Sequence, residues 1–385
     1  MSEPDFSAEL AKLAAADLLR RRRAVDSAQG PRVNVDGVIY LSFCSNDYLG
    51  LANHPKLAEA AVQAIGRHGV GAGASHLVSG HHALHEALEQ RLSRFMDRAC
   101  LLFSGGYGAN IGVLPALAGR EDAIFADRLN HASLIDGARL SRAAVQRFRH
   151  NDLSNLEQLL AVTPARRRLI VVDGVFSMDG DMAPLPQLLA LAERHDAWLY
   201  VDDAHGFGVL GEHGRGILEY FGMTSARIVH LCTLGKAAGV SGAAVFAEPT
   251  VIDWLVQSAR SYIFATAAPP ALAAALLASV ELIEQEPWRR EHLHALIAQL
   301  RAACADLPWR LLPSDTPIQP LVVGENAAAL ALAEALRERG IWVPAIRPPT
   351  VAAGTARLRI SLSAAHTRED VEQLTHALHA AAERA

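Results

Sequence analysis

The chain has 385 residues, of which 51% are apolar and 20% charged, and this composition predicts a globular protein with room for one large and one smaller domain. Its formal net charge of -5 argues against nucleic-acid binding. Four widely separated cysteines favour a reducing cytoplasm, and we expect no membrane span, because the longest apolar stretch is interrupted by Pro269 and Pro270.

The N-terminal segment, residues 1–45, is predicted to begin with an amphipathic helix over residues 6–23, where leucines and alanines recur at helical spacing. The arginine run 20–23 is interpreted as the basic C-terminal end of this helix. Extended structure follows over residues 33–41 around the turn Asp36–Gly37. The segment SNDYLGL (residues 45–51) then leads into a helix that begins near Pro55.

From about residue 80, helices and strands alternate along the chain. Helices are expected over residues 82–96 and 107–117, and strands over residues 99–103, 123–126, 169–172, 198–201 and 228–231. Several of these strands are apolar on both faces, which is typical of a mainly parallel sheet covered by helices. We therefore predict an α/β large domain over residues 46–284, with its ligand beyond the carboxyl ends of the strands.

The pattern changes after a long helix expected at residues 270–285. Helices are expected over residues 290–306 and 327–339 and at the C-terminus, with strands over residues 318–323, 342–346 and 358–361. This order predicts a smaller α+β domain over residues 285–385.

Lys236 lies in the glycine-rich segment TLGKAAG (residues 233–239), directly after a predicted buried strand. It is one of only three lysines, with Lys12 and Lys56, although lysine and arginine together number 36. Only lysine can form an imine, and a desolvated lysine has a lowered pKa and attacks a carbonyl as the free amine. The alternative is a salt-bridged or solvated lysine in a loop, so other motifs must decide.

Two further segments follow predicted strands and carry suitable chemistry. VDDAHGFG (residues 201–208) places Asp202 and His205 at a carboxyl end, where a buried carboxylate needs a cationic partner such as a protonated pyridine nitrogen, or caps a helix. FSGGYGAN (residues 103–110) is a glycine-rich turn before a helix, whose free N–H groups suit a phosphate. Its spacing matches neither a P-loop nor the dinucleotide fingerprint.

Two polar residues complete the set. His131 in ADRLNHASL stands at the start of a helix, and Ser177 in GVFSMDGD stands in the loop after another strand. An imidazole can stack on a flat heteroaromatic ring, although either residue is also compatible with ordinary loop polarity. Taken together, a phosphate cradle, an imine-forming lysine and an acid for a pyridine nitrogen predict a pyridoxal 5'-phosphate (PLP) site.

At this point the sequence resembles the α-oxoamine synthases, members of the PLP-dependent transferases of fold type I. The resemblance covers nearly the whole chain, through SNDYLGL, FSGGYGAN, ADRLNHASL, GVFSMDGD, VDDAHGFGVLGEHGRG, TLGKAAGVSGAAV and AIRPPTVAAGTARLRIS. It implies that Lys236 forms the imine with PLP, that Asp202 pairs with the pyridine nitrogen and that His131 stacks on the ring. These three residues are the expected catalytic set.

The resemblance also implies roles for residues around the cofactor and the substrates. His205 and Ser177 are expected near the ring oxygen, and Gly106, Tyr107 and Thr233 near the phosphate. Thr266 is expected to reach the phosphate of the partner subunit's cofactor, which implies a homodimer with active sites at the interface. The expected substrate-binding residues are Arg20, His131, Arg347 and Thr350, with Arg347 on the amino acid carboxylate. The register within the arginine run 20–23 is defined only to within one residue.

The branch of the family that is most similar condenses L-alanine with a pimeloyl thioester, carried by coenzyme A or acyl carrier protein, with loss of carbon dioxide in biotin biosynthesis. Glycine C-acetyltransferase, 5-aminolevulinate synthase and serine palmitoyltransferase are the alternatives within the family. An aminotransferase and a catalytically silent partner subunit are the alternatives outside it. The GVFSMDGD and VDDAHG motifs argue against the aminotransferase, and Lys236 argues against the silent subunit.

Three positions depart from the family pattern. Asp173 stands where relatives usually have Glu, Phe264 where many have Tyr, and His76 where several have Arg. None of these changes removes a group that the imine needs. We expect them to affect rate and acyl preference.

Overall fold

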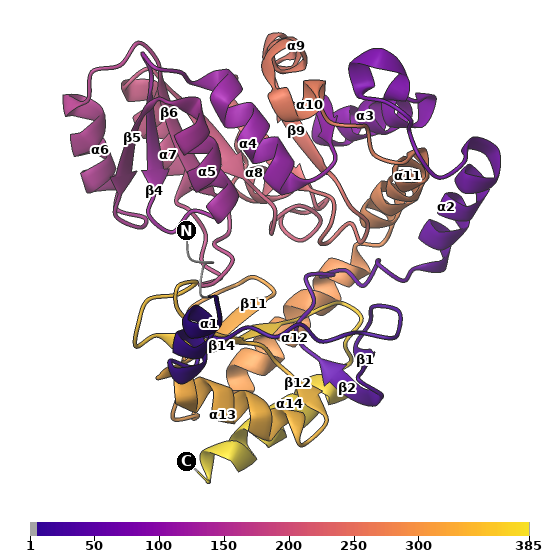
Figure 1. Ribbon diagram of the computed structural model, residues 1–385, viewed down its shortest axis with the longest axis vertical. Coiled ribbons are helices and arrows are strands. Elements are labelled where there is room, and N and C mark those ends of the chain that lie inside the picture. Colours follow the sequence, from indigo (N-terminus) through magenta and orange to yellow (C-terminus); the bar gives the residue numbers. More distant parts are fainter. Residues whose placement is uncertain (1–5, 385) are drawn as a thin grey trace. The chain divides into compact units, whose positions relative to one another are not determined.

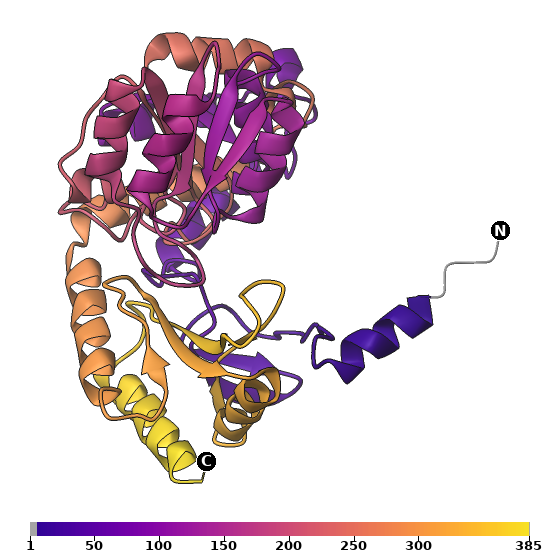
Figure 2. The same cartoon turned by 90° about the vertical axis from the view of Figure 1, so that its left-hand side faces the viewer.

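The structure is a computed structural model that describes residues 6–384, and these residues form two compact units (Figures 1 and 2). The large unit contains residues 49–177 and 181–291. The small unit contains the described residues up to 48, residues 178–180 and those from 292 onward. The three-part division expected from the sequence (1–45, 46–284 and 285–385) stays a prediction, because compactness alone does not say which segments fold independently.

The large unit is built on a seven-stranded sheet with the order β3-β9-β8-β7-β6-β4-β5. All its strands are parallel except β9, which runs antiparallel to both β3 and β8, so the predicted mainly parallel sheet is confirmed. The strands are β3 (Ala99–Phe103), β4 (Ala123–Asp127), β5 (Ala144–Phe148), β6 (Arg168–Asp173), β7 (Ala197–Asp202), β8 (Ile228–Thr233) and β9 (Ala243–Ala247).

Helices cover this sheet (Figure 1). On one face, apolar residues of α4, α5 and α9 pack with alternate strand residues such as Leu101, Ile124 and Leu231 in one buried cluster, while α11 packs against α2 and α3. The helices of this unit are α2 (Pro55–His68), the π-helical turn η1 (His76–Gly80), α3 (Ala83–Met96), α4 (Gly106–Leu117), α5 (Ala132–Ser141), α6 (Leu153–Val162), α7 (Leu185–Arg194), α8 (Ile217–Tyr220), α9 (Pro249–Ser258), α10 (Arg260–Ile263) and α11 (Pro270–Gln285).

The small unit contains two further sheets, with the orders β1-β2-β12 and β10-β11-β14-β13. Their strands are β1 (Arg32–Val35), β2 (Val38–Ser42), β10 (Arg310–Leu311), β11 (Ile318–Gly324), β12 (Ile341–Trp342), β13 (Ala345–Ile346) and β14 (Ala356–Ser361). The remaining helices are α1 (Phe6–Ala15), α12 (Trp288–Ala303), α13 (Asn326–Arg337) and α14 (Arg368–Ala382). Strands and helices together confirm the α+β character expected for the C-terminal region.

Most predicted elements end within a few residues of their predicted bounds, but two expectations were wrong. The N-terminal helix ends at Ala15, and Asp17 adopts a positive φ of 56°, so the arginine run 20–23 follows the helix without being part of it. The strand expected at 342–346 is two short strands in different sheets, because Pro344, which has no N–H to donate, separates β12 from β13.

Among residues 6–384, no helix combines the length and apolar character that crossing a membrane requires.

Candidate functional site

The carboxyl ends of five parallel strands carry most of the predicted cofactor residues. Because these strands run in the same direction, the loops that follow them lie at one edge of the large sheet (Figure 1). The residues at this edge are Gly106 and Tyr107 after β3, His131 after β4, Ser177 after β6, Asp202 and His205 at and after β7, and Thr233 and Lys236 at and after β8.

Lys236 is held in a tight turn after β8. Gly239 closes this turn with a φ of +71°, and its N–H donates to the Lys236 carbonyl at 2.8 Å. A Cβ at Gly239 would lie 2.6 Å from the Ala52 nitrogen, so only glycine fits there. The lysine is half-buried, and its Nζ lies 2.9 Å from His205 Nε2. The structure therefore brings Lys236 and His205 together.

Asp202 is buried and held by a polar network. Asn110 on α4 donates through Nδ2 to Asp202 Oδ2 at 2.7 Å and to Ser133 Oγ at 2.9 Å. The Tyr200 hydroxyl donates to Asn110 Oδ1 at 2.7 Å, which fixes the orientation of the amide. The Ala204 N–H donates to the other oxygen of Asp202 at 3.1 Å. Asp202 is thus fixed by dipoles that stabilise its negative charge.

Asn110 was not singled out from the sequence, although FSGGYGAN contains it. The signal that could have identified it is a polar residue at a buried position of an otherwise apolar helix, because such a group requires partners. Its partners on β7 and α5 were not predictable from local spacing.

His131 caps the N-terminus of α5. Its Nδ1 accepts from the Ser133 N–H at 3.3 Å and lies 2.7 Å from Ser133 Oγ. Its backbone N–H donates to Asp173 Oδ2 at 2.7 Å. Partial desolvation and the nearby Lys236 charge lower the pKa of the His131 imidazole, although Asp202 opposes them. This effect favours a neutral ring, as stacking on a heteroaromatic ring requires.

Asp173, a departure from the family pattern, is buried beside Asp202 on the neighbouring strand. Burial, together with the charge of Asp202, raises the pKa of Asp173 well above its usual value. The Asp173 carboxyl nevertheless accepts the hydrogen bond from the His131 backbone N–H. The shorter side chain therefore retains a positioning contact.

The glycine-rich turn after β3 meets the end of β8. A Cβ at Gly106 would lie 2.5 Å from Thr233 Oγ1, so the Gly106 backbone and the Thr233 hydroxyl are close together. The N-cap of α4, Gly105, provides no side-chain cap, which leaves the first N–H groups of the helix available to an anion. The Tyr107 hydroxyl bonds to Asp136, and its ring meets that of His131 edge-on at 6.3 Å.

These residues fit PLP. Asp202 is buried and accepts hydrogen bonds from the neutral Asn110 amide and the Ala204 N–H, so this carboxylate suits a protonated pyridine nitrogen. The turn at Gly106 and Thr233 suits the phosphate, and the Lys236 amine suits the aldehyde.

Two other predicted cofactor residues lie in the large unit. Ser177 is half-buried in the loop after β6. Thr266 is exposed in the single chain, and its backbone bridges that of Ser75. Its role toward a partner subunit stays a prediction.

The predicted substrate residues lie together in the small unit. Arg20 Nη2 donates to Thr350 Oγ1 at 3.4 Å, and Arg347 donates through Nη1 to the Asp17 carbonyl. Arg347 Nε is buried and has no partner. A pocket of about 300 Å³ is lined by Leu18, Arg20, Arg21, Ala345, Ile346, Arg347, Pro348 and Thr350. Three guanidinium groups around one pocket are suited to carboxylates.

The other two departures lie in the large unit, where Phe264 is exposed and His76 is half-buried. The Phe264 side chain is exposed, with the Arg260 guanidinium 4.9 Å from its ring centre. The ring of His76 stacks on Tyr262 at 4.8 Å. Their effect on rate and acyl preference stays a prediction.

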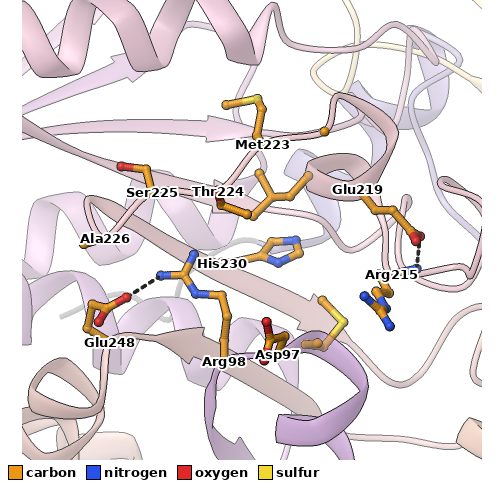
Figure 3. A pocket seen from close by; sticks show the side chains of 13 residues that line it. Asp97, Arg98, Arg215, Glu219, Met223, Thr224, Ser225, Ala226, His230 and Glu248 are labelled. Atoms are coloured by element: carbon orange, nitrogen blue, oxygen red, sulfur yellow. Dashed lines mark hydrogen bonds and ion pairs between the residues drawn. The ribbon is translucent and has the colours of Figure 1, made fainter.

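A separate pocket of about 590 Å³ lies at the amino end of β8, away from Lys236 (Figure 3). Arg98 and Glu248 pair across it at 3.9 Å, and the buried His230 forms part of its wall. None of the predicted site residues lines this pocket. It is therefore not part of the site at the carboxyl edge.

Comparison with known proteins first defines the class. Residues 38–378 match the family described as aminotransferase class I and II, and the fold is that of PLP-dependent enzymes of fold type I. Among solved structures, a variant of serine palmitoyltransferase from S. paucimobilis with a bound aldimine of PLP and myriocin is 28% identical, with a TM-score of 0.93 over 98% of this chain and 97% of that one. An 8-amino-7-oxononanoate synthase from Francisella tularensis is 30% identical, with a TM-score of 0.78 over 90% of this chain and 98% of that one.

Curated relatives define the family more closely. The chain is 59% identical to an 8-amino-7-oxononanoate synthase of Aromatoleum aromaticum over 97% of both chains. It is 58% identical to 8-amino-7-oxononanoate synthase 1 of Polaromonas sp. (strain JS666), over 97% of this chain and 95% of the relative. The chain belongs to the family of 8-amino-7-oxononanoate synthases.

Proposed function

We propose that the chain catalyses the decarboxylative condensation of L-alanine with a pimeloyl thioester to give 8-amino-7-oxononanoate, with PLP as its cofactor, in biotin biosynthesis. The observation that carries the proposal is the half-buried Lys236 amine 2.9 Å from His205 Nε2, at the strand edge that also holds Asp202. Relatives with this activity in their names share 58 to 59% of their residues with nearly the whole chain.

When bound, PLP supplies an electron-accepting ring that stabilises negative charge on the Cα of the amino acid. Lys236 would hold the cofactor through its amine, and the same amine, as the free base, would take the proton from Cα. His205 keeps the amine in place through the contact to Nζ. The overall reaction joins the α-carbon of L-alanine to the acyl carbonyl, releases the thiol and carbon dioxide, and returns a proton to the α-carbon to give the amino ketone.

Asp202 and His131 prepare this chemistry from two sides. Asp202 keeps a proton on the pyridine nitrogen, and Asn110 holds the carboxylate in the orientation that this bond requires. His131 covers the ring as a neutral imidazole. Ser177 lies near the ring oxygen.

Gly106, Tyr107 and Thr233 bind the phosphate, supported by the free N–H groups at the start of α4. Thr266 binds the phosphate of the partner subunit's cofactor in a homodimer whose active sites lie at the interface. Its exposure in the single chain is compatible with such a contact.

The pocket in the small unit binds carboxylates of the substrates. Arg347 pairs with the carboxylate of L-alanine through its planar guanidinium, while Arg20 and Thr350 contact the acyl substrate. His131 also contacts the bound amino acid. A pimeloyl group carries a distal carboxylate or its ester, and the cationic lining suits the acid. The donor is pimeloyl-CoA or pimeloyl-[acyl-carrier protein], and the reaction takes place in the cytoplasm.

The test combines purified protein and PLP with L-alanine, glycine or L-serine and with pimeloyl, acetyl or palmitoyl coenzyme A, and measures thiol release. We expect release with L-alanine and pimeloyl coenzyme A, lost in Lys236→Ala and retained in Lys56→Ala, which removes an exposed lysine of α2. If L-serine with palmitoyl coenzyme A, or glycine with acetyl coenzyme A, is preferred, the assignment within the family is wrong. Turnover of a keto acid without any thioester reaction would identify an aminotransferase.

A further inference from the structure

A cluster of histidines lies in the large unit around η1 and the start of α3. His76 and His81 stand at the two ends of the turn η1, and His85 lies in the first turn of α3. Ring centres of His76 lie 5.1 Å from those of both His81 and His85. One nitrogen from each of these three residues lies within 4.8 Å of the others. None of the three belongs to the predicted cofactor or substrate site.

The contact between His76 and His81 is unusual, because their Nδ1 atoms lie 2.9 Å apart. Two bare lone pairs repel, so either one Nδ1 carries a proton or a cation lies between them. His81 Nε2 is 3.2 Å from Glu86 Oε2 and 4.0 Å from Glu89 Oε2, which keeps its proton on Nε2. With the proton on Nε2, the Nδ1 atom of His81 presents a lone pair to His76.

His85 also presents a lone pair on Nδ1. Its Nε2 donates to the Ala268 carbonyl at 2.8 Å, which fixes the proton there. Its Nδ1 accepts from the His82 N–H at 3.0 Å in the capping box of α3, and this bond has to open before Nδ1 can bind a metal ion. The turn therefore gathers up to three imidazole nitrogens, with a carboxylate behind one of them.

We propose that His76, His81 and His85 form a binding site for Zn²⁺, in which Glu86 is a positioning residue that acts through His81. Zinc takes neutral imidazole ligands at about 2.0–2.1 Å, which places tetrahedral ligand nitrogens about 3.4 Å apart. The 2.9 Å pair has to open by only about half an ångström, and His85 closes in as the third ligand. A carboxylate on the far nitrogen of a ligand histidine is the usual outer support of such sites. Water fills the fourth position.

Binding of Zn²⁺ to His76 and His81 releases no proton. In the metal-free cluster His76 carries its proton on Nδ1 and donates it toward His81. When Zn²⁺ takes the two Nδ1 lone pairs, this proton moves to His76 Nε2. Because the His76 proton only moves from Nδ1 to Nε2, its transfer releases no proton to the buffer, and the binding enthalpy should be the same in buffers with different enthalpies of ionisation.

The site has a structural consequence for a neighbouring segment. The Ala267 N–H donates to the Ala74 carbonyl at 3.0 Å, Ser75 bridges Thr266, and His85 bonds Ala268. A metal ion held by His76 and His85 would fix the side of this contact that bonds residues 266–268. Zn²⁺ should slow hydrogen exchange of the amides in residues 266–268.

The experiment titrates Zn²⁺ into the holoenzyme, prepared without an affinity tag and dialysed free of excess PLP, with calorimetry as the readout. We expect one Zn²⁺ per chain in the wild type, at least 100-fold weaker binding in His76→Gln and in His81→Gln, and about 10- to 100-fold weaker binding in Glu86→Gln. His68→Gln is the matched control, because this exposed histidine contacts His82 at 4.4 Å but lies outside the trio.

Glu86 is exposed, so its variant tests the proposal even if a histidine variant fails to fold. Absence of saturable binding in the wild type would overturn the proposal. Equal affinity in wild type, His76→Gln and His81→Gln, or equal weakening by His68→Gln, would also overturn it. Slower exchange in residues 266–268 on adding Zn²⁺, in the wild type and not in His81→Gln, would support it.

Discussion

His150 is expected to make the stability of the large unit depend on pH above neutrality. Its Nδ1 lies 3.1 Å from Asp127 Oδ1 and its Nε2 lies 2.8 Å from Asp181 Oδ2. Burial alone would lower the pKa of His150, but the hydrogen bonds and charges of the two carboxylates outweigh it and raise this pKa from 6.5 to about 10. The ring therefore stays protonated at pH 7 in the folded protein.

The direction in which the free energy of unfolding changes with pH follows from the linkage between protonation and folding. A folded-state pKa above the unfolded value stabilises the protein fully below pH 6.5, and this stabilisation is lost as the pH rises through about 10. One pKa unit corresponds to about 1.4 kcal/mol, so between pH 7 and pH 9 the free energy of unfolding should fall by about 2 kcal/mol. This value allows for some solvent screening, because about a fifth of the side chain is exposed (22%).

The assay is urea unfolding of the protein at pH 7 and pH 9 at constant ionic strength. His150→Gln should remove about 2 kcal/mol of the loss that the wild type shows between the two pH values. His213→Gln, which removes an exposed histidine bonded to Glu219, should leave the loss unchanged. If His150→Gln loses as much stability as the wild type over this range, the reasoning about the ion pairs of His150 with Asp127 and Asp181 is wrong.

Three further substitutions test the site. Gly106→Ala should weaken PLP binding at least 10-fold, about 1.4 kcal/mol, because its Cβ would lie 2.5 Å from the Thr233 hydroxyl. Gly105→Ala is the control and should leave PLP binding unchanged, because its Cβ would meet nothing within 4 Å. Absorbance titration with PLP measures the affinity of both variants. Gly239→Ala should lower the free energy of unfolding by about 1–3 kcal/mol, because its φ is +71° and its Cβ would meet backbone atoms. Gly235→Ala is the control and should change this free energy by about 0.5 kcal/mol or less. Urea unfolding measures both variants. Asn110→Ala should lower the free energy of unfolding by about 3 kcal/mol in urea unfolding, because it removes a hydrogen-bond partner from the buried Asp202 and from the buried Tyr200. It should also lower the affinity for PLP. Unchanged affinity would contradict the role of Asn110 in orienting the Asp202 carboxylate.

The strands that lead into the site were predictable because they are short apolar runs followed by polar or glycine-rich motifs. The run 228–231 before Lys236 is fully buried, and the run before Asp202 is buried except for Trp198, which is half-buried. Both strands need to be apolar on two faces, because helices cover the sheet on either side. The order of the strands was not predictable, since β9 pairs with its sequence neighbour β8 on one side but on the other side with β3, through residues more than 100 positions apart.

Residues that act through distant partners could not be assigned from local patterns. Arg20 meets Thr350 across 330 residues, and periodicity alone placed this arginine at the end of a helix that the structure ends at Ala15. Only the resemblance to a family pointed to the pocket that these residues share with Arg347. The local pattern reports the helical potential of a segment, while tertiary contacts decide where the helix ends.

The same limitation explains why His150 and Asn110 were missed although both matter for the site. His150 joins Asp127, at the end of the strand before His131, to Asp181, whose carbonyl accepts from Phe176 in the loop that carries Ser177. Asn110 joins α4 to β7 and α5 in a similar way. Each uses hydrogen bonds to fix loops whose own sequences specify no geometry. The catalytic motifs therefore indicate which groups are needed, and polar partners such as the half-buried His150 and the buried Asn110 determine where the groups lie.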